Sequence, residues 1–300
     1  MDLQKELIEF HPCHDYYVGI DSDGCVFDSM EVKQKEFFIP LALKYFNLFP
    51  IAGILRRTWE FINLYSINRG GNRFISLVKV FDLLEKDESI RQSAVQLPDL
   101  RSLRIWIDSE NKLGNESLRN YYESNPDNGI EKVLLWSEAV NNEIRTWLKN
   151  IPPFPAVKGA LELISGKADI AVISQTPLEA VKREWEENDL SKLTKLIAGQ
   201  EHGTKAEHLS LSAAGKYSND KILMIGDAKG DLDAAHKNGV LFYPVVPGYE
   251  NDSWERFMRS GFSRFIDGSF RGEYENSLIN EFLKHLPEKP DNTLKKHTLL

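Results

Sequence analysis

The first pair of acidic residues is spaced so that both members can act on one bound group. Asp21 and Asp23 follow the apolar run Tyr16–Ile20 within the tetrapeptide Asp-Ser-Asp-Gly. Alternate residues of an extended chain project to one side, so the two carboxylates share a side where that run ends. One can act as a nucleophile and the other as a general acid or base. Because this tetrapeptide is also common in turns, it leaves the catalytic and the turn interpretation open.

A second pair of acids suits a metal ion. Asp227 and Asp231 follow the apolar run Lys221–Ile225 in the sequence Gly-Asp-Ala-Lys-Gly-Asp. Four acids at neighbouring strand ends would repel one another unless a cation, a lysine or protonation offsets their charge. Carboxylate oxygens are the ligands that Mg²⁺ selects. The pattern therefore predicts a magnesium site.

Ser174 is positioned to meet an anion. It ends the apolar run Asp169–Ser174, and Thr176, Pro177 and Glu179 fit the first positions of a capped helix. We expect that helix to begin beside Ser174, with its free N–H groups and positive dipole end available to an anion.

Lys205 lies within a second capping pattern, Thr-Lys-Ala-Glu. The pattern places this lysine in the first turn of a helix, where the dipole disfavours a cation. An anion close to Lys205 would compensate, and a solvated surface lysine is the alternative interpretation.

Short apolar runs alternate with helical patterns in the part of the chain that carries these residues. The runs are Tyr16–Ile20, Asp169–Ser174, Lys221–Ile225 and Leu241–Val246, and the helical patterns are Val157–Ser165, Leu178–Asn188, Ala206–Ala214 and Asp231–Asn238. This alternation predicts an α/β fold with a doubly wound parallel sheet. Ligands of such sheets bind at the carboxyl ends of the strands, where the acids stand.

Residues 30–149 have a different pattern. They contain few strand-like runs and several amphipathic helical windows, which are Val32–Phe46, Phe74–Leu84 and Glu131–Leu148. The proline-rich stretch Ile151–Pro155 marks the return to the α/β part. We therefore predict a discontinuous core from residues 1–29 and 150–300, interrupted by an α-helical domain over 30–149.

Four features follow one another along the chain: a strand with DxDG, a strand ending in Ser, a Lys that opens a helix, and a strand with GDxxxD. This ordered set resembles the haloacid dehalogenase (HAD) superfamily of phosphohydrolases. The resemblance covers about residues 16–30 and 151–247. It implies a Rossmann-like core, with the inserted helical domain in the place of a C1-type cap. It also implies a Mg²⁺-dependent phosphatase that hydrolyses a small phosphorylated metabolite.

The resemblance assigns a role to each matching residue. Asp21 matches the nucleophile that forms an aspartyl-phosphate. Asp23 matches the acid/base residue, which also gives its backbone carbonyl to Mg²⁺. Ser174 and Lys205 match the hydroxyl and the lysine that orient the phosphate. Asp227 matches a metal ligand, as do Asp21 and Asp23, and Asp231 matches a nearby supporting acid. In this chain Cys25 replaces a common Thr, and Gln175-Thr176 replaces the more usual Asn-containing continuation.

Two other functions fit the same residues. A phosphomutase of the β-phosphoglucomutase type would return the phosphoryl group to a sugar, and a non-catalytic phosphate-binding or regulatory protein would keep the site as a scaffold. The net charge of −8 argues against a nucleic-acid partner. The absence of a long apolar run argues against a membrane partner. With only two cysteines, 13 and 25, a cytoplasmic protein is expected.

Arg69 and Arg73 flank a double glycine within Asn68–Arg73 of the inserted domain. One hypothesis is a mobile loop that reaches over the active site and binds a charged or hydroxylated leaving group. The alternative is an ordinary turn between helices.

Overall fold

The computed structural model describes residues 4–290 and divides the chain into two compact units. Of the described residues, unit 1 contains 4–30 and 149–287, and unit 2 contains 31–148 together with 288–290, which the prediction had placed in the core. Each unit has a hydrophobic core of its own. The predicted core range includes residues 1–3 and 291–300, which lie outside the described residues.

Unit 1 is built on a five-stranded sheet in which every neighbouring pair of strands is parallel. Its order is β3-β2-β1-β4-β5. The strands are β1 (Tyr16–Ile20), β2 (Ala168–Ile173), β3 (Leu196–Ala198), β4 (Ile222–Gly226) and β5 (Leu241–Pro244). The predicted α/β fold is thus confirmed. The short β3 strand was not among the predicted runs, because three residues are too few for a periodic pattern.

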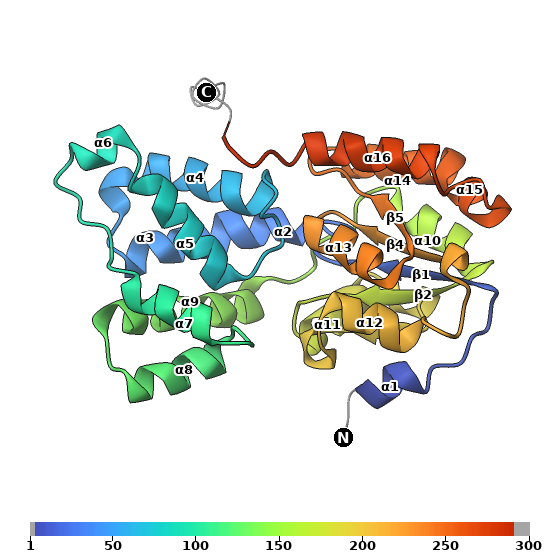
Figure 1. The fold of residues 1–300 in the computed structure, drawn as a ribbon, viewed down its shortest axis with the longest axis horizontal. Coiled ribbons are helices and arrows are strands. Elements are labelled where there is room, and N and C mark those ends of the chain that lie inside the picture. The colour runs from blue at the N-terminus through green and yellow to red at the C-terminus, as the bar shows by residue number, and fades with distance from the viewer. Residues whose placement is uncertain (1–3, 291–300) are drawn as a thin grey trace. The chain divides into compact units, whose positions relative to one another are not determined.

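Helices follow the strands of unit 1 in the predicted alternation (Figure 1). They are α1 (Gln4–Ile8), α10 (Val157–Ser165), α11 (Leu178–Glu187), α12 (Lys205–Ser212), α13 (Lys229–Asn238), α14 (Glu250–Arg256), α15 (Phe262–Asp267) and α16 (Glu273–Lys284), with the short turns η3 (Ser191–Leu193), η4 (Gln200–His202) and η5 (Asn219–Lys221) and the π-helix η6 (Phe257–Gly261). Gly239 closes α13 with φ 66°, a left-handed value that suits glycine. The α14–α16 segment was not predicted.

Side chains alternate between the two faces of the sheet along each strand, and each face packs against its own set of helices. Val18 and Ile20 of β1 enter a core shared with side chains of α10, α11, α14 and α15. Tyr17 faces the other way, and its hydroxyl lies 2.6 Å from Oγ of Ser212 in α12. A Cβ at Gly19 would stand 3.1 Å from the Leu209 side chain. The small residue in β1 therefore lets α12, which carries Lys205, pack closely on the sheet.

Unit 2 consists of helices. They are α2 (Ser29–Val32, which begins in unit 1), the π-helix η1 (Lys33–Phe38), α3 (Ile39–Tyr45), η2 (Phe49–Ile51), α4 (Ala52–Leu64), α5 (Arg73–Leu84), α6 (Glu88–Arg91), α7 (Arg101–Ser109), α8 (Asn115–Ser124) and α9 (Asn128–Trp147). Trp136 lies at the centre of its core, edge-on to Phe38 at 5.8 Å and to Trp59 at 5.7 Å. Apolar helix faces that meet around large aromatic side chains hold this unit together.

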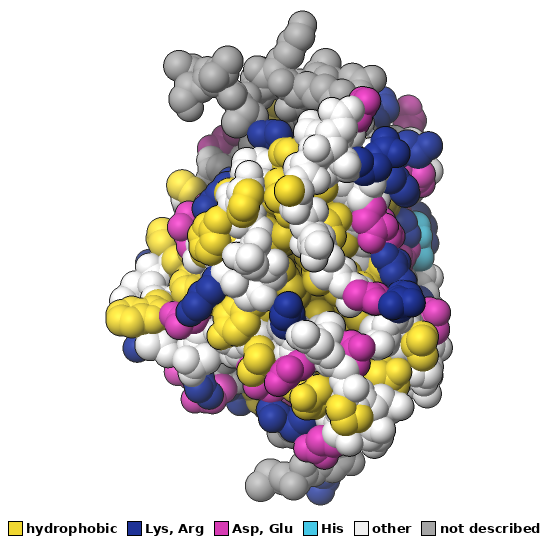
Figure 2. Space-filling model, turned by 90° about the vertical axis from the view of Figure 1, so that its left-hand side faces the viewer, with side chains coloured by type: hydrophobic (Ala, Val, Ile, Leu, Met, Phe, Trp, Pro, Cys, Tyr) yellow, Lys and Arg dark blue, Asp and Glu magenta, His cyan; other side chains and the backbone are white. Residues whose placement is uncertain are grey.

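The surface carries apolar side chains among charges of both signs. Figure 2 shows this mixture on the face over unit 2. The most exposed large apolar side chains are Phe49, Ile105 and Trp147. Within residues 4–290, every helix is too short or too polar to cross a membrane.

Candidate active site

The predicted acids Asp21 and Asp227 stand where the order of the strands reverses. The chain passes outward from β1 to β2 and β3, and then returns to β4 on the opposite side of β1. Ile20 is in register with Ile225, so Asp21 and Asp227 follow the carboxyl ends of adjacent strands. Open parallel sheets bind ligands at this kind of reversal.

The loop Asp21–Phe27 carries the first two acids and is closed by its own backbone. The Ser22 carbonyl accepts hydrogen bonds from the amides of Val26 at 2.9 Å and Phe27 at 3.2 Å. Gly24 has φ 78°, a left-handed conformation that a side chain would strain. Both acids are nearly inaccessible, with Asp21 4% and Asp23 9% exposed. The loop therefore holds two carboxyl groups in a largely buried place.

Asp231 packs against the end of β4, and a glycine makes room for it. A Cβ at Gly226 would lie only 2.3 Å from the carboxyl carbon of Asp231. Oδ2 of Asp231 accepts the amide of Ala228 at 3.0 Å. The glycine of the Gly-Asp-x-x-x-Asp pattern thus leaves the space that the carboxyl group of Asp231 occupies.

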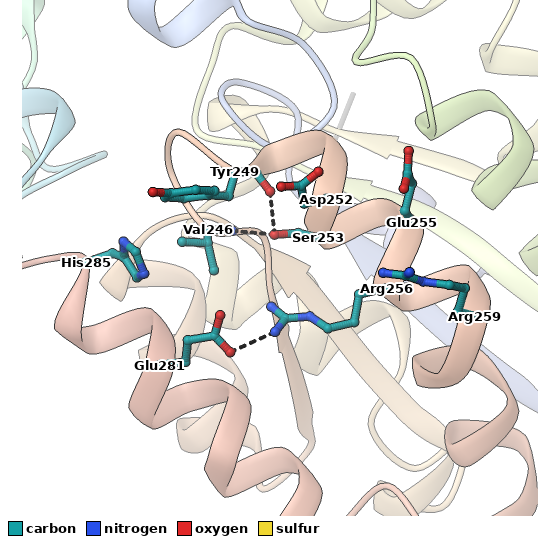
Figure 3. Close-up of a pocket in the computed structure, with 9 residues that line it drawn as sticks. All are labelled: Val246, Tyr249, Asp252, Ser253, Glu255, Arg256, Arg259, Glu281 and His285. Atoms are coloured by element: carbon teal, nitrogen blue, oxygen red, sulfur yellow. Dashed lines mark hydrogen bonds and ion pairs between the residues drawn. The ribbon is translucent and has the colours of Figure 1, made fainter.

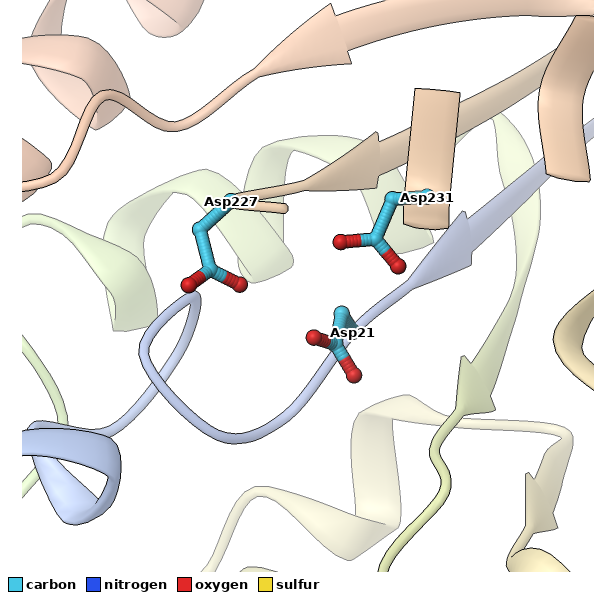
Figure 4. A group of neighbouring side chains, drawn as sticks. All are labelled: Asp21, Asp227 and Asp231. Carbon is cyan, nitrogen blue, oxygen red and sulfur yellow. The ribbon is translucent and has the colours of Figure 1, made fainter. Parts of the chain in front are cut away.

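Three acids and one lysine converge on this point. One carboxylate oxygen from each of Asp21, Asp227 and Asp231 lies within 4.8 Å of the other two. Figure 4 shows the three side chains gathered together. Nζ of Lys205 is 2.9 Å from Oδ2 of Asp21 and 2.6 Å from Oδ1 of Asp231. The predicted capping box of α12 is present, with Thr204 at the N-cap and Glu207 at N3. It starts the helix so that its first residue is Lys205.

The charges in this cluster are strongly coupled because they are buried. Burial raises the pKa of Asp21 well above its ordinary value, Lys205 lowers it, and Asp231 and Asp227 raise it further. The pKa of Asp231 is raised by burial and by Asp227, against the effect of Lys205. Burial alone would lower the pKa of Lys205, but Asp21 and Asp231 outweigh it, so that pKa is raised.

The donor set fits a divalent cation. When all groups are ionised, three carboxylates and one ammonium leave two negative charges in a buried place, which favours a bound cation. All candidate ligand atoms are oxygens, as Mg²⁺ prefers. Lys205 and the Ala228 amide already engage the oxygens of Asp231. Asp21 and Asp227 are therefore the carboxylates best placed to bind the ion.

Asp23 is held by two hydroxyl groups. Thr176 donates from Oγ1 to Oδ2 of Asp23 at 2.6 Å, and Ser29 donates to Oδ1. The predicted capping role of Thr176 is wrong, because α11 begins at Leu178 after Pro177 and has no side-chain cap. Sequence reasoning also missed Ser29, which has no motif to mark it, whereas Thr176 could have been found as a hydroxyl two residues after Ser174.

Ser174 lies at the end of β2, the strand next to β1. It is 1% exposed, and its amide donates to the Ala198 carbonyl at 3.0 Å. Its Oγ accepts the amide of Thr176 at 3.1 Å. Nearby, Gln175 donates from Nε2 to the carbonyl of Gly203 at 2.9 Å. The loop after β2 is thus tied to the loop that precedes Lys205.

Arg69 and Arg73 lie in unit 2, where Arg69 is in the turn between α4 and α5 and Arg73 is the first residue of α5. Arg69 is 2% exposed and donates from Nη1 to the Leu64 carbonyl at 3.0 Å. Arg73 donates to Oδ1 of Asn141 at 2.7 Å and to the carbonyl of Ser137 at 3.2 Å. The segment is therefore an inter-helix turn in which both guanidinium groups bind their own unit. Their role toward a substrate stays a prediction.

Unit 1 also has a cleft of about 600 Å³ that is formed by other residues. Side chains from the α14–η6 segment and from α16 line it, and Arg256 pairs there with Glu281 at 2.7 Å (Figure 3). Asp252, Glu255 and Arg259 add charges of both signs. This mixed lining does not define one class of ligand.

Comparison with known families gives one match along the sequence. Residues 104–245 match the family model described as haloacid dehalogenase-like hydrolase. The matched range contains Ser174, Lys205, Asp227 and Asp231, and it begins after Asp21. No curated protein matches the chain.

Solved structures of several bacterial proteins are similar to the chain at low identity. A haloacid dehalogenase-like hydrolase from Streptococcus pneumoniae is 12% identical, with TM-score 0.44, covering 80% of this chain and 90% of its own. A "predicted phosphoglycolate phosphatase" from Haemophilus somnus is 15% identical, with TM-score 0.48 and coverages of 83% and 99%. A "predicted phosphatase" from Clostridium acetobutylicum is 18% identical, with TM-score 0.41 and coverages of 83% and 91%.

The range that matches the family model can be placed on the fold. The matched range supplies β2 to β5 of the parallel sheet, with the lysine and the second acidic pair at its carboxyl edge. β1 completes the sheet from outside that range and adds the first acidic pair. Residues 104–245, a little under half of the chain, are therefore similar to the haloacid dehalogenase-like hydrolases.

Proposed function

We propose that the protein is a Mg²⁺-dependent phosphatase that hydrolyses a small phosphorylated metabolite through an aspartyl-phosphate on Asp21. One observation carries the proposal. The carboxylate of Asp21 is buried at the strand reversal, 2.9 Å from the ammonium of Lys205 and beside Asp227 and Asp231. A carboxylate nucleophile needs no base to activate it, and the surrounding charges suit a phosphoryl group.

The reaction has two steps. An oxygen of Asp21 attacks phosphorus, the bond from phosphorus to the ester oxygen breaks, and Asp23 gives its proton to the departing oxygen. A water molecule then attacks the phosphorus of the acyl phosphate, Asp23 takes the proton from that water, and inorganic phosphate and the Asp21 carboxylate are released. Lys205 and Ser174 orient the phosphoryl oxygens throughout.

Asp21 and Asp227, with the backbone carbonyl of Asp23, are the groups that would hold Mg²⁺. When bound, the ion supplies charge neutralisation between the attacking carboxylate and the phosphoryl group. Asp231 acts through Lys205, to which it is bonded at 2.6 Å. It keeps the ammonium fixed beside the nucleophile.

The inserted helical unit is proposed to serve as the cap. It follows directly on the loop that carries Asp21 and Asp23, because unit 2 begins at Glu31. A cap in that position of the chain would shield the reaction from bulk solvent, apart from the one water molecule that attacks the acyl phosphate, and would contact the leaving group. The two arginines of the inter-helix turn, Arg69 and Arg73, are its candidates for leaving-group contacts.

A screen of the purified protein tests this function. Phosphorylated sugars, acids and nucleotides are supplied with and without Mg²⁺, and released phosphate is measured. We expect turnover that requires the divalent ion and that Asp21→Asn abolishes. The matched control is Asp233→Asn, because Asp233 is a solvent-exposed acid on α13 whose side chain pairs with Lys229.

Other outcomes would redirect the assignment. Activity on an aryl phosphate that survives Asp21→Asn, or that needs no divalent metal, contradicts the mechanism. A rearranged sugar phosphate in place of free phosphate identifies a phosphomutase. Tight binding of Mg²⁺ and phosphate without turnover on any ester identifies a non-catalytic phosphate-binding protein.

A further inference from the structure

Two buried tryptophans hold the loop that carries the acidic pair. Nε1 of Trp185 donates to Oγ of Ser22 at 3.0 Å. Nε1 of Trp254 donates to the backbone carbonyl of Cys25 at 2.8 Å. Ser22 separates Asp21 from Asp23, and Cys25 lies two residues beyond, so both bonds reach the short segment that sets the position of the carboxylates.

We propose that Trp185 and Trp254 are positioning residues for the loop Asp21–Phe27, called the nucleophile loop below. They act through the hydrogen bonds of their indole N–H groups to Ser22 and Cys25. The inference rests on the proposed function, in which Asp21 and Asp23 are the reacting groups. It adds to that function two residues, from α11 and α14, that do not touch the substrate.

The surroundings make these hydrogen bonds effective. Both indoles are fully buried, and so are Ser22 and Cys25, so water does not compete for the donors. The hydroxyl of Ser22 donates to Oε2 of Glu184 at 3.3 Å, which leaves a lone pair of Oγ directed at Trp185. The acceptor is therefore oriented by a residue adjacent to its donor in α11.

The rings of the two tryptophans are also fixed by packing. Trp185 lies edge-on to Phe27 at 5.9 Å, and Trp254 lies edge-on to Phe257 at 6.0 Å. Phe27 is the last residue of the nucleophile loop, so Trp185 contacts this loop at two points. Packing therefore fixes each indole ring independently of its hydrogen bond. A side chain that is fixed in this way can hold a reacting group in position.

A simple packing role is the competing explanation, since both tryptophans belong to the core of unit 1. A buried indole N–H does not always have a hydrogen-bond acceptor in this protein, because Nε1 of Trp106 has none among the described residues. Trp136 offers a direct comparison. Its Nε1 donates to the carbonyl of Phe38 at 3.3 Å in the core of unit 2, which is also a buried indole-to-backbone bond.

The experiment replaces the indole donor and keeps an aromatic ring. Trp185→Phe, Trp254→Phe and the control Trp136→Phe are compared in kcat, KM and Tm on the best phosphate ester with Mg²⁺. A displaced nucleophile lowers the rate of the chemical step, and misplacement by about 1 Å costs on the order of a hundredfold. We expect kcat to fall at least about tenfold in the first two variants, with KM changed less than about twofold. The control should lose a similar amount of Tm and keep its kcat.

A second measurement does not depend on turnover. Hydrogen–deuterium exchange is followed for the peptide that contains Val26 and Phe27, whose amides donate to Ser22, without substrate and without metal. Faster exchange in Trp185→Phe and Trp254→Phe, and not in the control, supports the inference. Unchanged exchange and unchanged kcat in both variants would overturn it. If the wild-type protein hydrolyses no ester, the proposed function fails, and the exchange result still decides whether the indoles order this loop.

Discussion

A buried histidine close to Lys205, His208, makes the stability of the protein depend on pH. His202 and His208 are fully buried, with ring centres 6.1 Å apart in an edge-to-face arrangement. Nε2 of His202 and both ring nitrogens of His208 have no hydrogen-bond partner among the described residues. Burial, together with His202 and Lys205, lowers the pKa of His208 from 6.5 to about 4. The folded protein therefore keeps this ring neutral.

The sign and size of the effect follow from that shift. Between pH 6.5 and about 4, the imidazole of His208 binds a proton in the unfolded chain and not in the folded one. The free energy of unfolding therefore falls as the pH falls through this range. With about 1.4 kcal/mol per pKa unit, the loss from this one group between pH 7 and pH 5 is about 2 kcal/mol.

His208→Phe removes the titrating group and both ring nitrogens. We expect a free energy of unfolding at pH 7 equal to or above that of the wild type, and a loss between pH 7 and pH 5 that is smaller by about 2 kcal/mol. Urea unfolding at the two pH values measures both quantities. His236→Phe is the control, because His236 is an exposed histidine on α13.

Two results would refute this reasoning. If His208→Phe loses as much stability as the wild type between pH 7 and pH 5, the ring of His208 is not the group that binds the proton. If the same variant is strongly destabilised at pH 7, a ring nitrogen has a partner that the phenyl ring cannot replace.

Four further substitutions test the proposed site residues. Gly226→Ala puts a Cβ against the carboxyl group of Asp231, so we expect kcat to fall at least about tenfold, and an unchanged kcat would show that the acid can move without consequence. Lys205→Gln removes the cation that bonds both Asp21 and Asp231, and initial rates at saturating substrate should fall on the order of a hundredfold. Arg69→Ala and Arg73→Ala should raise KM for the true substrate, and unchanged kinetics in both would remove their proposed role.

Much of the core of unit 1 could be predicted from local patterns. β1 and α10 have the predicted bounds, because an apolar run bounded by polar residues and a helical period are short-range signals. Gly239 closes α13 and Thr204 caps α12 for the same reason. The short β3 strand and the α14–α16 segment lack such signals. Contacts with β2 and with the core of unit 1 stabilise them.

The capping prediction at Thr176 failed for a physical reason. Its hydroxyl could bond either the free amides of α11 or the carboxylate of Asp23, and the folded chain brings it to Asp23 at 2.6 Å. The amide of Leu178 is instead satisfied by Glu201, a residue of the following 3₁₀ turn.

By itself, the sequence determined the chemical types of the site residues, the strand ends that the acids and Ser174 follow, and the helix start at Lys205, because those depend on neighbours a few positions apart. Only the tertiary structure decided that Lys205 bonds both Asp21 and Asp231, that Thr176 holds Asp23, and that Trp254 reaches the nucleophile loop from a helix beyond the last strand. These contacts join segments far apart in the chain. They form because the strand order β3-β2-β1-β4-β5 brings the carboxyl ends together and because buried donors must find acceptors there.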